Sequence, residues 1–127
     1  MPENIKKRIL VIDDDPALRR LISFGLTRAG YEAITADNGA VAMEILAGQK
    51  VDLVLVDLMM PVVDGLGFLR WLRHEAKVEI PALVFTSHDA AEVIDKALAS
   101  GATDLVNKPV QLRELLAKVA RLILPEG

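Results

Sequence analysis

Acidic residues follow two of the most apolar runs of the chain. Asp13, Asp14 and Asp15 come directly after RILVI, and Asp57 comes directly after DLVLV. Carboxylates gathered at one place repel one another and lose hydration, so they need either protons or a cation between them. A hard divalent ion with oxygen ligands is the natural complement. Mg²⁺ fits best, because it typically binds one or two carboxylates together with waters and a phosphate.

Hydroxyl and ammonium groups follow two further apolar runs. Thr86 and Ser87 come directly after IPALVF, and Lys108 and Pro109 come directly after DLVN. Each feature alone has an ordinary explanation: Asp15 is a good helix cap, and a lone Thr suits a strand. Their occurrence at corresponding ends of several runs favours a shared site over separate caps and turns.

Five short apolar runs, rich in Val, Ile and Leu, predict the strands that must position these groups. They lack clean alternation, which is typical of strands buried on both faces of a parallel sheet. EAITA is the most polar run, so we expect it near an edge. The runs are RILVI (8–12), EAITA (32–36), DLVLV (52–56), IPALVF (80–85) and DLVN (104–107).

Helical patterns with apolar residues spaced by three and four lie between and after the runs. Asp15 is the expected N-cap of the first, and Gly30 ends it. The others are expected at about 39–47, from 64 to about 75, at about 90–100, and at 112–123. This alternation predicts an α/β fold: a doubly wound, five-stranded parallel sheet with right-handed crossovers and helices on both faces.

The carboxyl ends of parallel strands lie at one edge of the sheet, where ligands bind in open α/β folds. The acids, the hydroxyls and the ammonium should therefore meet at that edge. Lys108 offers one positive charge, which is too little for three or four acids. The sequence therefore predicts a site for a divalent cation.

Composition narrows the class of protein. With 127 residues, 52% of them hydrophobic and 26% charged, we expect a single globular domain over residues 1–127. Cysteine is absent, which excludes disulfides and thiolate chemistry. A net charge of −3 argues against direct nucleic-acid binding, and apolar runs are far shorter than the roughly 20 residues that span a membrane. We expect a soluble cytoplasmic protein without membrane contact.

Four motifs, VIDDDP, LVLVDLMMPVVDG, PALVFTS and GATDLVNKP, occur in this order. With their spacing, the chain from roughly Arg8 to Ile123 resembles the CheY-like receiver domain of two-component response regulators. The resemblance implies a flavodoxin-like (βα)₅ fold with strand order 2-1-3-4-5.

The resemblance also implies the roles of the acids. Asp57 resembles the phosphoacceptor, whose carboxylate attacks phosphorus and forms an aspartyl phosphate. Asp14 resembles the principal Mg²⁺ ligand, and Asp13 the neighbour that holds the metal through water. Met59 occupies the position whose backbone carbonyl completes the metal shell. Mn²⁺ is an alternative ion.

The remaining roles concern charge and switching. Thr86 resembles the switch hydroxyl, and Lys108 resembles the ammonium that neutralises a phosphoryl oxygen. Pro109 is similar to the family's cis-proline. Leu105 stands where the family usually has Tyr, Phe or His, so we expect it to respond when Thr86 moves, with a smaller surface change than an aromatic residue gives.

The implied function is a phosphorylation-controlled signalling domain and not an enzyme beyond its own phosphorylation and dephosphorylation. The expected donor is a sensor histidine kinase or a phosphotransfer domain. The surface of the fourth helix, fifth strand and fifth helix is expected to contact a second copy or an output domain. Lys118 and Arg121 match only part of the charged set of one dimerising branch, so the branch stays open, as does any domain after Gly127.

Three other functions fit these residues less well. A flavodoxin-like mononucleotide binder needs a phosphate-cradling loop where this chain has DDDP. A haloacid-dehalogenase-type phosphatase would use Asp13 in a D-x-D-x-T pattern, but Ala17 stands where Thr is needed. A receiver-like scaffold that never takes phosphate is disfavoured by the intact set of Asp14, Asp57, Thr86 and Lys108.

Overall fold

Strands and helices alternate along the chain in the computed structural model, which describes residues 6–60, 63–87 and 91–123. The strands are β1 (Arg8–Ile12), β2 (Glu32–Ala36), β3 (Leu53–Asp57), β4 (Ala82–Thr86) and β5 (Asp104–Asn107). The helices are α1 (Pro16–Arg28), α2 (Gly39–Gly48), α3 (Gly65–Arg70), α4 (Ala91–Ala99) and α5 (Leu112–Leu122), and a π-helical segment, η1 (Trp71–Glu75), continues α3.

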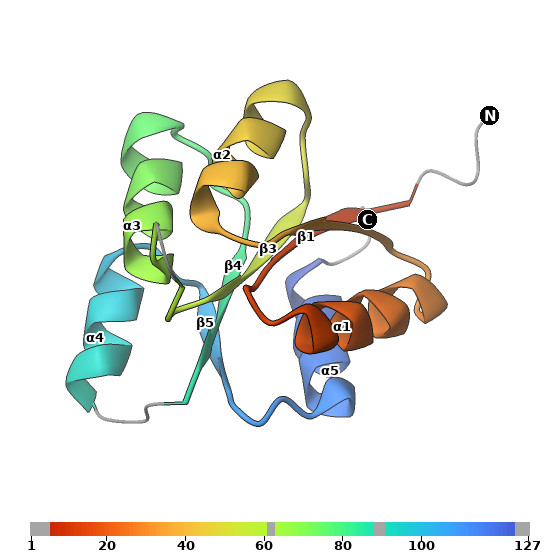
Figure 1. Ribbon diagram of the computed structural model, residues 1–127. Helices are drawn as coiled ribbons and strands as arrows, with labels where there is room; N and C mark the ends of the chain where they lie inside the picture. Colours follow the sequence, from red (N-terminus) through yellow and green to blue (C-terminus); the bar gives the residue numbers. More distant parts are fainter. Residues whose placement is uncertain (1–5, 61–62, 88–90, 124–127) are drawn as a thin grey trace.

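The five strands form one parallel sheet in the order β2-β1-β3-β4-β5 (Figure 1). This confirms the doubly wound α/β fold and the strand order that the resemblance implied. β2 lies at an edge, as its polar sequence predicted, and only its last residue, Ala36, is buried.

Helices cover both faces of the sheet (Figure 1). A hydrophobic core fills each interface between the helices and the sheet. On one face, α2, α3 and α4 lie over alternate residues of the central strands, including Leu10, Val54 and Val84. On the other face, α1 and α5 lie over the intervening residues. Because successive strand residues face opposite ways, strands covered on both sides must be apolar throughout. This explains the unbroken apolar runs.

Two strands are displaced by one or two residues from their predicted bounds. Asp52 lies just before β3, and its carboxylate accepts a hydrogen bond from the Arg8 N–H, 2.8 Å away. At the other end, Asp57 pairs with Phe85, and Thr86 pairs with Asn107. Asp57 and Thr86 are therefore the last residues of their strands, and not the first residues after them.

Local signals determine where helix α1 begins and ends. The Asp15 carboxylate accepts hydrogen bonds from Ala17 N–H at 3.0 Å and from Leu18 N–H at 3.4 Å, so it is the predicted N-cap. Gly30 has a φ of +99°, which a residue with a side chain rarely adopts. The predicted first residue of the fourth helix, residue 90, lies outside the described residues.

Among the described residues, no helix is both long and apolar enough to cross a membrane.

Candidate functional site

Three carboxylates meet at the carboxyl edge of the sheet. Asp13 follows β1, Asp57 ends β3, and these two strands are neighbours, with Ile12 paired to Val56. One oxygen from each of Asp13, Asp14 and Asp57 lies within 4.8 Å of the others. We call these three residues the acid cluster. The structure thus brings together the side chains that the sequence predicted to hold a divalent cation.

Lys108 lies against the acid cluster. Its Nζ is 3.0 Å from Asp57 Oδ2 and 3.9 Å from Asp13 Oδ2. The Lys108 N–H donates to the Thr86 carbonyl at 2.9 Å, which ties the loop after β5 to the end of β4. The Lys108–Pro109 peptide bond is cis, as the resemblance implied. Lys108 contributes one positive charge to a group of three carboxylates.

Asp13 is fully buried, and its two carboxylate oxygens differ in their surroundings. Oδ1 accepts a hydrogen bond from the Asp15 N–H at 2.8 Å. Oδ2 is buried and accepts no hydrogen bond from the described residues. Burial raises the pKa of Asp13, the charge of Asp57 adds to that rise, and Lys108 opposes it. A bound cation would satisfy this buried oxygen, which accepts no hydrogen bond.

Asp57 and Asp14 differ in exposure. Asp57 is 3% exposed, and its Oδ1 accepts a hydrogen bond from the Met59 N–H at 3.2 Å. Asp14 is exposed at the surface of the acid cluster. Met59 is 63% exposed and contacts the Asp57 carboxylate through its backbone N–H. All donor groups of the acid cluster are oxygens, and the set fits a hard divalent cation such as Mg²⁺.

Thr86 and Leu105 occupy neighbouring strands. Thr86 is buried at the carboxyl end of β4, at the same edge as the acid cluster. Leu105 pairs with Val84, further from that edge, and its half-buried side chain packs into the core under α4. The Leu105 carbonyl accepts a hydrogen bond from Lys118 Nζ at 2.7 Å, which ties β5 to α5.

Sequence reasoning missed two residues that shape the site. Arg19 Nη1 donates to the Asp13 carbonyl at 2.7 Å. Gly65 begins α3 so close to β3 that a Cβ there would lie 2.5 Å from the Asp57 carbonyl. Asp64-Gly65 at a helix start was a visible signal for the second. The adjacent arginines Arg19 and Arg20 were a visible signal for the contact with Asp13. Which of the two makes that contact depends on how α1 is rotated about its axis.

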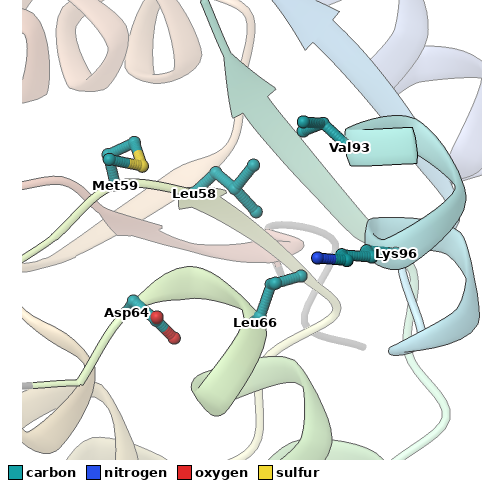
Figure 2. Close-up of a pocket in the computed structure, with 6 residues that line it drawn as sticks. All are labelled: Leu58, Met59, Asp64, Leu66, Val93 and Lys96. Carbon is teal, nitrogen blue, oxygen red and sulfur yellow. The ribbon is translucent and has the colours of Figure 1, made fainter. Parts of the chain in front are cut away.

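A separate apolar cavity of about 280 Å³ lies between α3 and α4 (Figure 2). Its lining residues are Leu58, Met59, Asp64, Leu66, Val93 and Lys96. Asp64 is the N-cap of α3, with its carboxylate 2.7 Å from the Gly67 N–H. The cavity therefore offers mainly apolar surface, with the Asp64 carboxylate that caps α3 and the Lys96 side chain as its charged groups. The carboxylates that could hold a cation lie in the acid cluster.

Fold and site together define a class: a doubly wound α/β domain with carboxylates and one ammonium gathered at the carboxyl edge of its sheet. The response regulator receiver domain family matches residues 9–120. The chain belongs to this family.

Solved structures agree with this assignment. The chemotaxis protein CheY4 of Vibrio cholerae superposes with a TM-score of 0.88 and 29% sequence identity, over 93% of this chain and 99% of that protein. The receiver domain of the Francisella response regulator 1452 superposes with a TM-score of 0.86 and 26% identity, over 92% of this chain and 96% of that one.

Curated relatives include response regulators that are longer than this chain. The probable transcriptional regulator ycf27 of Porphyra purpurea is 40% identical over 123 residues, which cover 95% of this chain and 49% of that protein. The response regulator MprA of Mycobacterium sp. (strain KMS) is 39% identical over 116 residues, 91% of this chain and 50% of MprA. The chain spans about half the length of these relatives.

Proposed function

We propose that residues 1–127 form one phosphorylation-controlled receiver domain, in which Asp57 accepts a phosphoryl group from a phosphohistidine in a Mg²⁺-dependent reaction. The observation that carries this proposal is the contact of Lys108 Nζ with Asp57 Oδ2 at 3.0 Å, inside a cluster of three carboxylates. The Asp57 carboxylate lies beside the Lys108 ammonium and belongs to the acid cluster that could bind a cation. These two positive charges would neutralise the negative oxygens of an incoming phosphoryl group.

Asp57 acts as the nucleophile in the proposed step. One of its carboxylate oxygens forms a bond to phosphorus while the P–N bond to the donor histidine breaks. The imidazole nitrogen leaves with the bonding electron pair, and the ring is neutral when its other nitrogen carries a proton. Phosphoryl transfer depends mainly on positioning and charge neutralisation. Lys108 and the Met59 N–H, both bonded to the Asp57 carboxylate, hold it in place for the transfer.

Asp13, Asp14, Asp57 and the Met59 backbone carbonyl would hold Mg²⁺, or Mn²⁺ in its place. When bound, the ion supplies positive charge to the phosphoryl oxygens. The buried Asp13 Oδ2 supports this assignment, because it accepts no hydrogen bond from the described residues and has only the more distant charge of Lys108 nearby, at 3.9 Å. Lys108 supplies a second positive charge through Nζ, which already lies close to two of the three carboxylates.

Thr86 and Leu105 are the proposed switch. The phosphoryl group carries a charge close to −2 at neutral pH and favours hydrogen-bond donors, and the Thr86 hydroxyl at the same sheet edge can supply one. We propose that Leu105 responds, and that the change reaches the surface of α4, β5 and α5. A second copy of the chain or an output domain would recognise that surface, and a sensor histidine kinase or a phosphotransfer domain in the cytoplasm would supply the phosphoryl group.

The test is phosphorylation with acetyl phosphate and Mg²⁺, followed by mass spectrometry of the intact chain and of its peptides. We expect one phosphoryl group on the parent chain and none on Asp57→Asn. Asp37→Asn is the matched control, because it removes an exposed carboxylate that also follows a strand at this edge. It should be labelled like the parent.

Two outcomes would contradict the proposal. Equal labelling of Asp57→Asn and the parent would exclude Asp57 as the acceptor. Label on Asp13 would instead indicate haloacid-dehalogenase-type chemistry, in which the acid after the first strand is the nucleophile.

A further inference from the structure

Arg19 joins helix α1 to the loop that carries two members of the acid cluster. The arginine is half-buried, and its Nη1 donates to the Asp13 carbonyl at 2.7 Å. The next residue, Arg20, is exposed. The same helix therefore offers two adjacent arginines of equal charge, one bonded to the site loop and one turned to solvent.

Other hydrogen bonds hold the backbone before and after the Asp13 carbonyl. The Asp13 N–H donates to the Ala36 carbonyl at 3.1 Å, which fixes Asp13 to β2. The Asp15 N–H donates to Asp13 Oδ1 at 2.8 Å, and Asp15 caps α1. The Arg19 bond fixes the Asp13 carbonyl itself. That carbonyl belongs to the planar peptide unit that joins Asp13 to Asp14, so its direction determines where the Asp14 backbone starts.

We propose that Arg19 is a positioning residue for the acid cluster, holding the Asp13–Asp14 peptide unit so that Asp14 stays within ligand distance of a cation shared with Asp13 and Asp57. This inference rests on the proposed Mg²⁺ site. Asp14 depends on its backbone for placement, because it lies at the exposed side of the acid cluster. Asp13, by contrast, is buried and bonded to β2 through its N–H, and Asp57 is a buried residue of β3. Groups that orient metal ligands commonly change metal affinity although they do not touch the metal.

The hydrogen bond and the charge of Arg19 have opposite effects on Mg²⁺ affinity. A positive charge close to carboxylates opposes the binding of a cation, so loss of the charge alone should tighten Mg²⁺ binding slightly. Loss of the positioning bond should weaken it. The Arg19 hydrogen bond goes to the backbone carbonyl of Asp13 and not to its carboxylate. The positioning effect should therefore exceed the charge effect.

The experiment is a calorimetric titration of the full chain with MgCl₂, using the parent, Arg19→Gln, Arg20→Gln and Arg19→Lys. We expect Arg19→Gln to weaken Mg²⁺ binding about tenfold, the lower end of the range for groups that orient metal ligands. Arg20→Gln removes the same charge and should bind Mg²⁺ as the parent does or slightly more tightly. Arg19→Lys keeps one donor and should lie between the parent and Arg19→Gln.

A second readout separates positioning from general damage. At saturating Mg²⁺, the rate of phosphorylation of Arg19→Gln by acetyl phosphate should return to near the parent rate, because the effect lies in cation binding. Thermal unfolding of each variant is recorded in parallel. If Arg19→Gln does not fold, Arg19→Met, which also removes the donor, takes its place: weakened Mg²⁺ binding in a folded variant supports the inference, and parent affinity overturns it.

Equal Mg²⁺ affinities of Arg19→Gln and Arg20→Gln would overturn the positioning role and leave the proposed function intact. Failure of the parent chain to bind Mg²⁺ would instead overturn the proposed metal site, and this inference with it. The two failures are therefore distinguishable in one set of titrations.

Discussion

Replacing Lys108 with Met tests the charge balance of the acid cluster. Met is similar in length to Lys but has no charge, so Lys108→Met removes the ammonium and leaves the carboxylates. The Lys108 side chain is 27% exposed, that of Asp57 is 5% exposed and that of Asp13 is fully buried. The variant therefore leaves the buried carboxylates of Asp57 and Asp13 without the Lys108 ammonium that lies close to both in the parent.

The size of the effect follows from the distance between the paired atoms. Unit charges at the 3.0 Å that separates Lys108 Nζ from Asp57 Oδ2 attract by about 1.4 kcal/mol in water and by about 5.5 kcal/mol at an effective dielectric constant of 20. Because Lys108 is partly exposed, we expect the variant to lose about 2–4 kcal/mol of unfolding free energy at neutral pH without Mg²⁺. For a chain of this size, that lowers Tm by roughly 10 °C.

The pH dependence has a definite sign. The Asp13 pKa is already raised above its ordinary value of 3.8, and the charge of Lys108 limits that rise. In Lys108→Met the pKa of folded Asp13 rises further, so the folded chain binds more protons than the unfolded chain between the two pKa values. Stability then falls as pH rises through that interval. The deficit of the variant should be greatest at neutral pH and should shrink in mild acid.

The assay is thermal unfolding followed by circular dichroism, with and without Mg²⁺, at neutral and mildly acidic pH. Mg²⁺ should reduce the deficit of Lys108→Met, because a bound cation replaces the missing charge. Lys118→Met is the matched control: the Lys118 side chain is 23% exposed in the parent, and its Nζ lies 3.5 Å from Asp104 Oδ2, away from the acid cluster. Its loss of stability should not depend on Mg²⁺.

Two results would refute this reasoning. One is a Lys108→Met variant as stable as the parent at neutral pH without Mg²⁺. The other is a deficit that Mg²⁺ leaves unchanged, as expected for Lys118→Met.

Three further substitutions test individual members of the site. Asp14→Ala should weaken Mg²⁺ binding at least about tenfold, or roughly 1.4 kcal/mol, because a charged ligand is lost; unchanged calorimetric titration would exclude Asp14 as a ligand. Asp13→Asn should raise unfolding free energy by about 1–2 kcal/mol at neutral pH without Mg²⁺, because a buried charge with a donorless oxygen disappears, and should weaken Mg²⁺ binding; a fall in Tm would contradict the reasoning. Thr86→Ala should still be phosphorylated but should lose the amide-exchange changes that beryllofluoride induces over residues 98–116 in the parent; persistence of those changes would exclude Thr86 as the switch.

Much of the fold could be predicted from the sequence, because its signals are local. Unbroken apolar runs predicted doubly covered strands, and Asp15 and Gly30 predicted the ends of α1. Alternation of strands and helices then placed the acids and Lys108 at one edge of the sheet. The strand order came from the family resemblance. The apolar runs of the central strands are too similar for composition to order them, and their order depends on packing between distant segments.

Tertiary structure decided which side chains touch. Asp57 and Thr86 belong to the strands themselves, because their backbones pair with the neighbouring strands. Lys108 reaches two carboxylates because the loop after β5 is tied to the Thr86 carbonyl. Arg19, and not Arg20, donates a hydrogen bond to the Asp13 carbonyl, because helix α1 turns only Arg19 toward the loop that carries Asp13. Residue types and strand ends therefore determined which chemistry gathers at the sheet edge, while the phase of a helix and the course of a loop, which depend on long-range packing, determined the contacts.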